Sequence, residues 1–167
     1  MADTSWVMER FEEIYETYRS QVEGYVRRRA PADVVEDVVA DVFVVCLRRI
    51  GDVPQAPLPW LYAVARKTLA NERRRSARTA PAETAVASEP EPVGDSALAS
   101  AFAELGDKDR EILRLIAWEG LSPGQAATVL GCSRVAARVR YHRAKARLAA
   151  QLADEPAIRP IQQGATR

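Results

Sequence analysis

A segment rich in proline and alanine, residues 79–96, places the strongest constraint on how this chain folds. It reads TAPAETAVASEPEPVGDS, contains three prolines and carries only negative charge. Because proline removes a backbone donor and breaks helices, such a segment favours an extended linker over a packed element. We therefore predict two small folded units, residues 1–78 and 97–153, joined by a flexible acidic linker at 79–96 and followed by a flexible tail at 154–167.

The composition supports two helical cores. Hydrophobic residues make up 47% of the chain, and the net charge of +1 hides an acidic linker between two units that carry many arginines. The two cysteines form no C-x-x-C pair and lie in apolar helical patterns, so we expect buried free thiols in a reducing compartment. The sequence shows neither a signal-peptide pattern nor an apolar run of transmembrane length. We therefore expect a cytoplasmic protein without membrane insertion.

Hydrophobic spacing predicts an all-α fold with three helices in the first unit and four in the second. The expected helices cover residues 6–29, 33–50 and 58–78, then 97–105, 107–118, 122–131 and 133–150. Asp33 with Glu36, and Ser122 with Gln125, have the spacing of capping boxes, and Asp107 is expected to cap its helix. The last two helices, joined by a short turn at 131–133, have the form of a helix-turn-helix. Tyr18, Tyr25 and Trp118 are expected in the core.

The last predicted helix combines an apolar stripe with a strongly basic opposite side. The stripe, which should face the preceding helices, consists of Ala137, Tyr141, Ala144 and Leu148. Arginines flank a narrow strip around Val135 and Val139, an arrangement that suits a helix lying in a major groove with phosphates on both sides. Arg138 is expected to reach guanine edges. The predicted DNA contacts are Ser133, Arg134, Val135, Arg138, Val139, Arg140, His142 and Arg143, and Lys145 and Arg147 continue the basic flanks.

A second basic face lies on the predicted helix 58–78. Leu61, Val64, Ala65, Thr68 and Leu69 form its inner face. The other side is basic, and a nucleic-acid backbone is its natural partner. The predicted DNA contacts are Arg66, Lys67, Asn71, Arg74, Arg75 and Arg78, with Arg73 adding charge beside them.

Carboxylates share the outer face of the predicted helix 33–50, at Asp33, Glu36, Asp37 and Asp41. Such a stripe suits a basic partner surface, although ordinary solvated helices also carry acidic stripes. No histidine or cysteine joins the carboxylates, and His142 is the only histidine of the chain. We therefore expect no catalytic residue, no metal site and no cofactor.

Two stretches together resemble a known family. VVEDVVADVF followed by PWLYAVARKTLANERRR resembles regions 2.2 to 2.4 of the extracytoplasmic-function (ECF) group of bacterial sigma factors. DREILRLIAWEGLSPGQAATVLGCSRVAARVRYHRAKARL resembles region 4 of the same group. The resemblance covers about residues 10–78 and 98–152, and the order of the two stretches makes it specific.

The resemblance implies roles for these residues. Glu36, Asp37 and Asp41, supported by Phe43, match the segment that docks on the coiled coil of the largest subunit of core RNA polymerase. Residues 52–59 match the loop that captures a flipped base of the −10 promoter element, and the predicted helix 58–78 matches the helix that meets −10 DNA. The helix-turn-helix matches the unit that binds the −35 element and the polymerase flap. The linker matches a segment that threads toward the active-site cleft, and an anti-sigma factor is an implied partner.

Two other functions remain open from the residues alone. A helix-turn-helix regulator would bind DNA without core polymerase and would not depend on the acidic helix. A regulatory protein that interacts with a sigma factor would leave both basic faces unexplained. An enzyme is the weakest alternative, because the sequence offers no nucleophile paired with a base, no metal-ligand cluster and no phosphate-binding loop.

Overall fold

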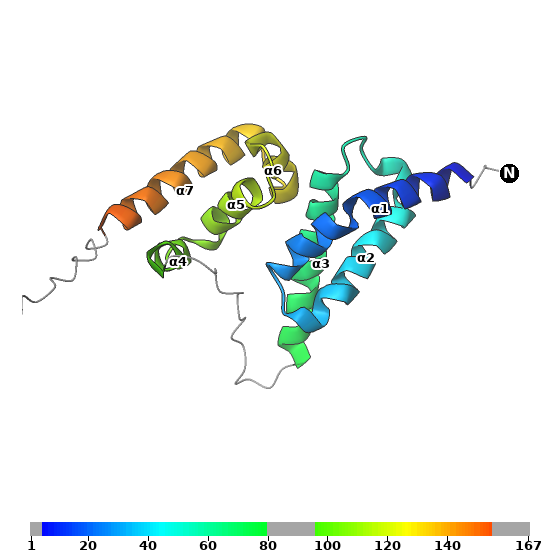
Figure 1. Ribbon diagram of the computed structural model, residues 1–167, viewed down its shortest axis with the longest axis horizontal. Coiled ribbons are helices and arrows are strands. Elements are labelled where there is room, and N and C mark those ends of the chain that lie inside the picture. Colours follow the sequence, from blue (N-terminus) through cyan, green and yellow to red (C-terminus); the bar gives the residue numbers. More distant parts are fainter. Residues whose placement is uncertain (1–4, 80–95, 155–167) are drawn as a thin grey trace, which may run out of the picture.

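The computed structural model describes residues 5–79 and 96–154, and every regular element within these ranges is helical (Figure 1). The elements are α1 (Ser5–Arg27), α2 (Val35–Arg48), α3 (Leu58–Thr79), α4 (Ser96–Ala103), α5 (Asp107–Ala117), α6 (Pro123–Leu130) and α7 (Arg134–Asp154), with 3-10 turns at Ala32–Val34 and Ile50–Asp52. The predicted all-α fold is confirmed. Most of the predicted linker and tail, at 80–95 and 155–167, lies outside the described residues.

Helices α1, α2 and α3 pack around a common apolar core. The valines of α2 recur at three and four residues, so Val38 and Val42 face inward although valine favours strands. On α3, Leu61, Ala65 and Leu69 are buried, and Val64 and Thr68 are half-buried, as the sequence predicted. The structure therefore places the basic residues of α3 on the side away from this core.

The start of α2 differs from the prediction. Pro31 has the φ of −57° that its ring imposes, and its carbonyl accepts the N–H of Val34 at 3.3 Å. This hydrogen bond closes a 3-10 turn, so the α-helix begins only at Val35, two residues after Asp33. Val34 then occupies the N-cap position without a side-chain cap, and the expected capping box of Asp33 and Glu36 does not form.

Helices α5, α6 and α7 form the second bundle, with α4 against α7. The capping box at α6 is confirmed, because Ser122 Oγ accepts the N–H of Gln125 at 3.2 Å while Gln125 Oε1 accepts the N–H of Ser122 at 2.9 Å. The predicted cap of α5 was wrong. Gly106 takes the N-cap position, and Asp107 is the first helical residue, where its carboxylate pairs with Arg110.

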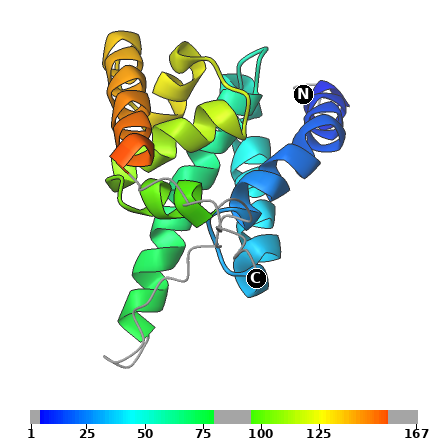
Figure 2. The same ribbon diagram turned by 60° about the vertical axis from the view of Figure 1, so that its left-hand side comes forward.

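The two bundles are in direct contact, which the sequence did not predict. Helix α6 packs against α3, and the two bundles lie side by side in Figures 1 and 2. The core of the first bundle continues into the second through Leu115, Leu121, Ala126 and Val129. A separate cluster, built around Ile112 and Ala144, stabilises the second bundle itself. Helix α6 is therefore shared, because one side contacts α3 and the other contacts α7.

Candidate nucleic-acid and partner interfaces

Helix α7 exposes the strip that the sequence predicted. Ala137 and Ala144 are fully buried, whereas Val135 is 73% exposed and Val139 is 42% exposed. Val135 and Val139 are four residues apart, so they place exposed apolar surface on one side of the helix, where a partner can cover it. Of the predicted contacts, Arg140 is half-buried and the rest are exposed: Ser133, Arg134, Val135, Arg138, Val139, His142 and Arg143.

The turn before α7 fixes how that helix is presented. Gly131 has a φ of +65°, a conformation that glycine adopts without the strain a side chain would add. The N–H of Cys132 then reaches the carbonyl of Ala127 at 3.1 Å, which closes the end of α6. Ser133 Oγ accepts the N–H of Ala136 at 3.1 Å and caps α7. These bonds set α6 and α7 in a rigid helix-turn-helix.

One arginine of the expected basic flanks forms an ion pair within the second bundle. Arg147 forms an ion pair with Asp109, a largely buried residue near the start of α5. Arg147 therefore ties α7 to α5 instead of adding to the phosphate-facing charge. Within residues 5–79 and 96–154, no carboxylate pairs with the other flanking arginines of the strip, at Arg134, Arg138, Arg140 and Arg143.

The exposed side of α3 carries the second basic face. All six predicted contacts, Arg66, Lys67, Asn71, Arg74, Arg75 and Arg78, are exposed. Arg74 Nη2 donates to Asn71 Oδ1 at 2.7 Å, so the amide oxygen of Asn71 already accepts a hydrogen bond. Arg75 pairs with Glu72 at 3.2 Å. Arg73 has a different role from the one expected, because its Nη2 donates to the carbonyl oxygen of Arg29 at 2.9 Å.

The acidic face of α2 lies beside apolar surface. Glu36, Asp37 and Asp41 are exposed, and Phe43 is buried against the aromatic rings of α1, with its ring 4.8 Å from that of Tyr15. Sequence reasoning missed two exposed side chains that continue this face, Val44 and Leu47, which are 44% and 38% exposed. Their positions three and six residues after Asp41 could have revealed them, because this spacing keeps side chains on the same side of a helix.

The loop between α2 and α3 is held by an arginine that sequence reasoning did not select. Arg10 Nη2 donates to the carbonyl oxygens of Val53 at 2.7 Å and Pro54 at 3.4 Å. A cavity of about 280 Å³ lies between α1 and this loop. It is lined by Arg10, Glu13, Ile14, Thr17, Tyr18, Pro54, Gln55 and Pro57. The loop therefore has a fixed shape and a recess beside it.

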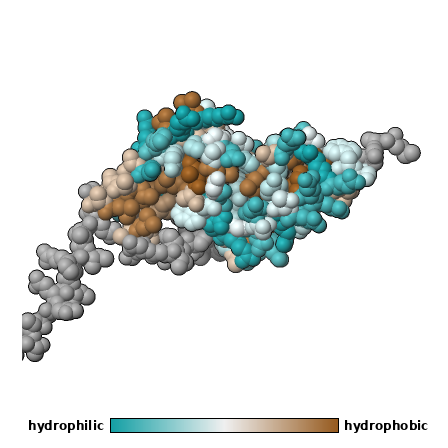
Figure 3. All heavy atoms as spheres, turned by 45° about the horizontal axis from the view of Figure 1, so that its top comes forward, coloured by the Kyte–Doolittle hydropathy of each residue, from teal (hydrophilic) through white to brown (hydrophobic). Residues whose placement is uncertain are grey.

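The predictions for the core aromatic residues and for the cysteines are confirmed only in part. Tyr25 is fully buried, but Trp118 is 51% exposed, so its expected core position was wrong. The rings of Trp118 and Phe102 meet in a T-shaped arrangement, and Leu98 on α4 is also exposed. Figure 3 shows apolar surface on the half of the molecule built by α4–α7. Both cysteines are free, and burial raises the pKa of the Cys46 thiol. Cys132 is only half-buried, so the expected burial of both thiols holds for Cys46 alone.

The described part of the chain contains no group of three or more histidine, cysteine, aspartate or glutamate residues arranged to hold a metal ion. None of its helices is both long enough and apolar enough to span a bilayer.

Comparison with protein families matches both bundles. Residues 14–79 match Sigma-70 region 2, and residues 95–148 match Sigma-70, region 4. The chain belongs to the ECF group of the sigma-70 family. It is a transcription initiation factor, a sigma factor that binds core RNA polymerase and recognises promoter DNA. A comparison with curated protein sequences gives no match.

Solved structures support the fold of this sigma factor. The structure of CnrH in complex with the cytosolic domain of CnrY is 25% identical, covers 87% of this chain and 89% of that chain, and has a TM-score of 0.60. The sigma factor RpoE in complex with the anti-sigma factor NepR from Bartonella quintana is 22% identical, with a TM-score of 0.62 and coverage of 87% and 98%. The PhyRSL–NepR complex from Sphingomonas sp. Fr1 is 19% identical, with a TM-score of 0.64 and coverage of 93% and 95%.

Proposed function

We propose that the two bundles divide the work of promoter recognition between them. In this proposal, residues 1–78 form region 2, which binds core polymerase and the −10 element, and residues 97–153 form region 4, which binds the −35 element. Residues 79–96 join the two regions, and 154–167 form a tail. The protein acts in the cytoplasm and is not an enzyme, because binding free energy alone drives its function.

The exposed strip of α7 is the observation that carries this proposal. It combines two open valines with arginines that no described carboxylate neutralises, on a helix that the turn holds rigidly. The valines match the methyl groups of thymines, and Arg138 matches the paired acceptors of guanine. We assign −35 contacts to Ser133, Arg134, Val135, Arg138, Val139, Arg140, His142 and Arg143.

Helix α3 supplies the downstream contacts in the same proposal. Its basic face meets the phosphate backbone of the −10 element through Arg66, Lys67, Asn71, Arg74, Arg75 and Arg78. The recess beside the loop at 52–59 supports capture of an unpaired base, because a base taken out of the stack needs a pocket with hydrogen-bonding groups. Holding that base lowers the free energy cost of opening the strands.

The acidic face of α2 supplies the contact with the polymerase. Glu36, Asp37 and Asp41 offer charge to a basic coiled coil, and the exposed Val44 and Leu47 add apolar area beside them. Phe43 supports this face from the core. The flap of the polymerase contacts region 4, and an anti-sigma factor is a further partner, as in the RpoE–NepR complex.

Run-off transcription with purified core polymerase tests the whole proposal. The chain added to core polymerase should yield a transcript from a promoter that carries matched −10 and −35 elements, and core polymerase alone should yield none. A chain that binds such DNA by itself but does not associate with core polymerase would instead be a helix-turn-helix regulator.

A further inference from the structure

The two predicted DNA-binding surfaces lie too close together in this structure to reach both promoter elements. Helix α6 contacts α3 on one side and α7 on the other, so a single helix separates the two surfaces (Figure 2). Packed helices lie about 8–10 Å apart, axis to axis. Helices of the length of α3 and α7, 22 and 21 residues, extend for about 30 Å each.

The promoter elements are much farther apart. Their names place them about 25 base pairs from each other, which is about 85 Å of duplex at about 3.4 Å per base pair. A chain whose two DNA-binding helices are separated by one helix cannot span that length. If the proposed function holds, on which this inference rests, the two bundles must separate before both elements are bound.

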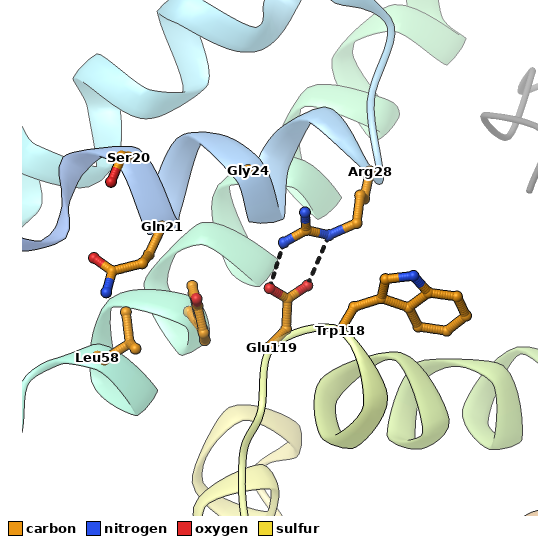
Figure 4. A pocket seen from close by; sticks show the side chains of 8 residues that line it. Ser20, Gln21, Gly24, Arg28, Leu58, Trp118 and Glu119 are labelled. Carbon is orange, nitrogen blue, oxygen red and sulfur yellow. Dashed lines mark hydrogen bonds and ion pairs between the residues drawn. The ribbon is translucent and has the colours of Figure 1, made fainter. Parts of the chain in front are cut away.

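An ion-pair network holds the two bundles together. Arg29, two residues after the end of α1, donates from Nε to Glu111 Oε1 at 3.2 Å and from Nη1 to Glu119 Oε1 at 2.8 Å. Its neighbour Arg28 reaches Glu119 Oε2 at 2.5 Å (Figure 4). The side chains of Arg29 and Glu119 are 5% and 1% exposed, so these charges are out of water while the bundles are in contact. We call Arg28, Arg29, Glu111 and Glu119 the latch.

Aromatic rings support the latch from the region 2 side. The guanidinium of Arg29 lies 3.7 Å from the ring centroid of Tyr25, which stacks on Tyr62 at 4.7 Å. The hydroxyl of Tyr25 donates to Glu111 at 3.3 Å. The carbonyl of Arg29 accepts a hydrogen bond from Arg73 on α3. Arg29 is thus preorganised by its own bundle before it meets the carboxylates of the other.

Apolar contacts close the remainder of the interface. Leu121 follows the turn that carries Glu119, and Val129 lies on α6; both are buried in the core shared with region 2. Beside the latch a recess of about 280 Å³ remains open between α1, α3 and Trp118 (Figure 4). The interface is therefore closed around the charges and open at one edge.

We propose that the latch holds the free sigma factor in a closed conformation and that release of the latch is a required step in binding promoter DNA with the polymerase. Burial of an arginine with two carboxylates is costly, and the same charges regain water when the bundles separate. Closure is therefore reversible. The apparent affinity for any partner that needs the open form is reduced by the fraction of molecules that is open.

The first measurement is small-angle X-ray scattering of the free full-length protein. The combined substitution Glu111→Gln and Glu119→Gln removes both carboxylates, and it should raise the radius of gyration by roughly a quarter, because separated units exceed the dimensions of one compact body. Val129→Asp should cause the same expansion from the apolar side. The control is Glu23→Gln, which breaks the exposed pair with Arg27 on the same helix. Circular dichroism verifies that each variant keeps its helix content.

The second measurement is titration of core polymerase with the same proteins. Both opening variants should bind roughly tenfold more tightly than the wild type, and the control should match the wild type. A wild-type radius as large as that of the variants, or variants that stay compact, would overturn the latch. Expansion without tighter polymerase binding would overturn its regulatory role. Failure of every protein to bind polymerase would reject the proposed function. The scattering result would then still decide whether the latch closes the free protein.

Discussion

Arg138 is the side chain of α7 on which upstream recognition depends most directly in our proposal. It is exposed, and no carboxylate of the described chain pairs with it, so its donors are available to guanine. Replacement by alanine should weaken binding of the holoenzyme to −35 DNA by about 1–3 kcal/mol, which is roughly fivefold to a hundredfold. Electrophoretic mobility shift assays measure this loss. Arg27→Ala on α1, outside both basic faces, should leave binding unchanged.

Tyr62 makes the stability of the protein sensitive to alkaline pH. Burial raises its pKa from 10.0 to about 12, and it raises the pKa of the neighbouring Tyr25 as well. A raised pKa means that the folded state holds the proton more tightly, so this contribution is complete below pH 10 and is lost as the pH rises from about 10 through 12. Chemical denaturation at pH 8 and pH 11 should show this loss, and Tyr62→Phe should make it smaller. Equal loss in both proteins would contradict the assignment.

Single residues also show where sequence reasoning reached its limit. The exposure of Val135 and the burial of Ala144 follow from helical periodicity, which the sequence contains. The pairing of Arg147 with Asp109 depends on how α7 crosses α5, and no local pattern records that crossing. Trp118 was expected in the core because it is large and apolar, yet it lies at the open edge between the bundles.

The capping box of α6 makes a measurable contribution to the stability of the helix-turn-helix. Ser122→Ala removes one hydrogen bond to the helix N-terminus and should lower the free energy of unfolding by about 1 kcal/mol. Thermal unfolding followed by circular dichroism should show a decrease of a few degrees in Tm. Ser76→Ala, at an exposed position on α3, should leave Tm unchanged.

The acidic face of α2 should decide binding to the polymerase. Reversal of Asp37 and Asp41 to lysine replaces attraction by repulsion against a basic surface, and we expect at least about a tenfold loss of affinity for core polymerase. Neither residue belongs to the buried core, so helix content should not change. Glu12→Lys, an exposed reversal on α1, is the matched control. Co-purification that persists after reversal of both aspartates would reject this assignment.

At the level of whole helices, the sequence predicted a helix start correctly where neighbouring residues favour the same turn. It failed where one residue favours a different turn from the expected cap. The start of α6 was predicted because serine, proline and glutamine act on the same turn. The start of α2 was not, because Pro31 closes a 3-10 turn before Asp33 can cap the helix. The contact of α6 with α3 joins elements far apart in the chain, so hydrophobic periodicity alone could not reveal it.

The shared core and the latch together should make the free protein unfold as one cooperative unit. Leu115 and Leu121 of region 4 lie in the same apolar cluster as the helices of region 2. If one bundle unfolds, the other exposes this buried apolar surface, so the two should unfold together. Breaking a buried ion pair by removal of one partner typically costs about 3–5 kcal/mol, because the remaining charge stays out of water. A protein that lacks the two carboxylates avoids this cost when its bundles separate, because Arg29 then regains water. Each bundle of that protein then unfolds on its own. Differential scanning calorimetry should therefore show one transition for the wild type and for Glu23→Gln, and two for the protein that lacks the carboxylates of Glu111 and Glu119. Two transitions in the wild type would mean that the interface contributes too little free energy to couple the bundles.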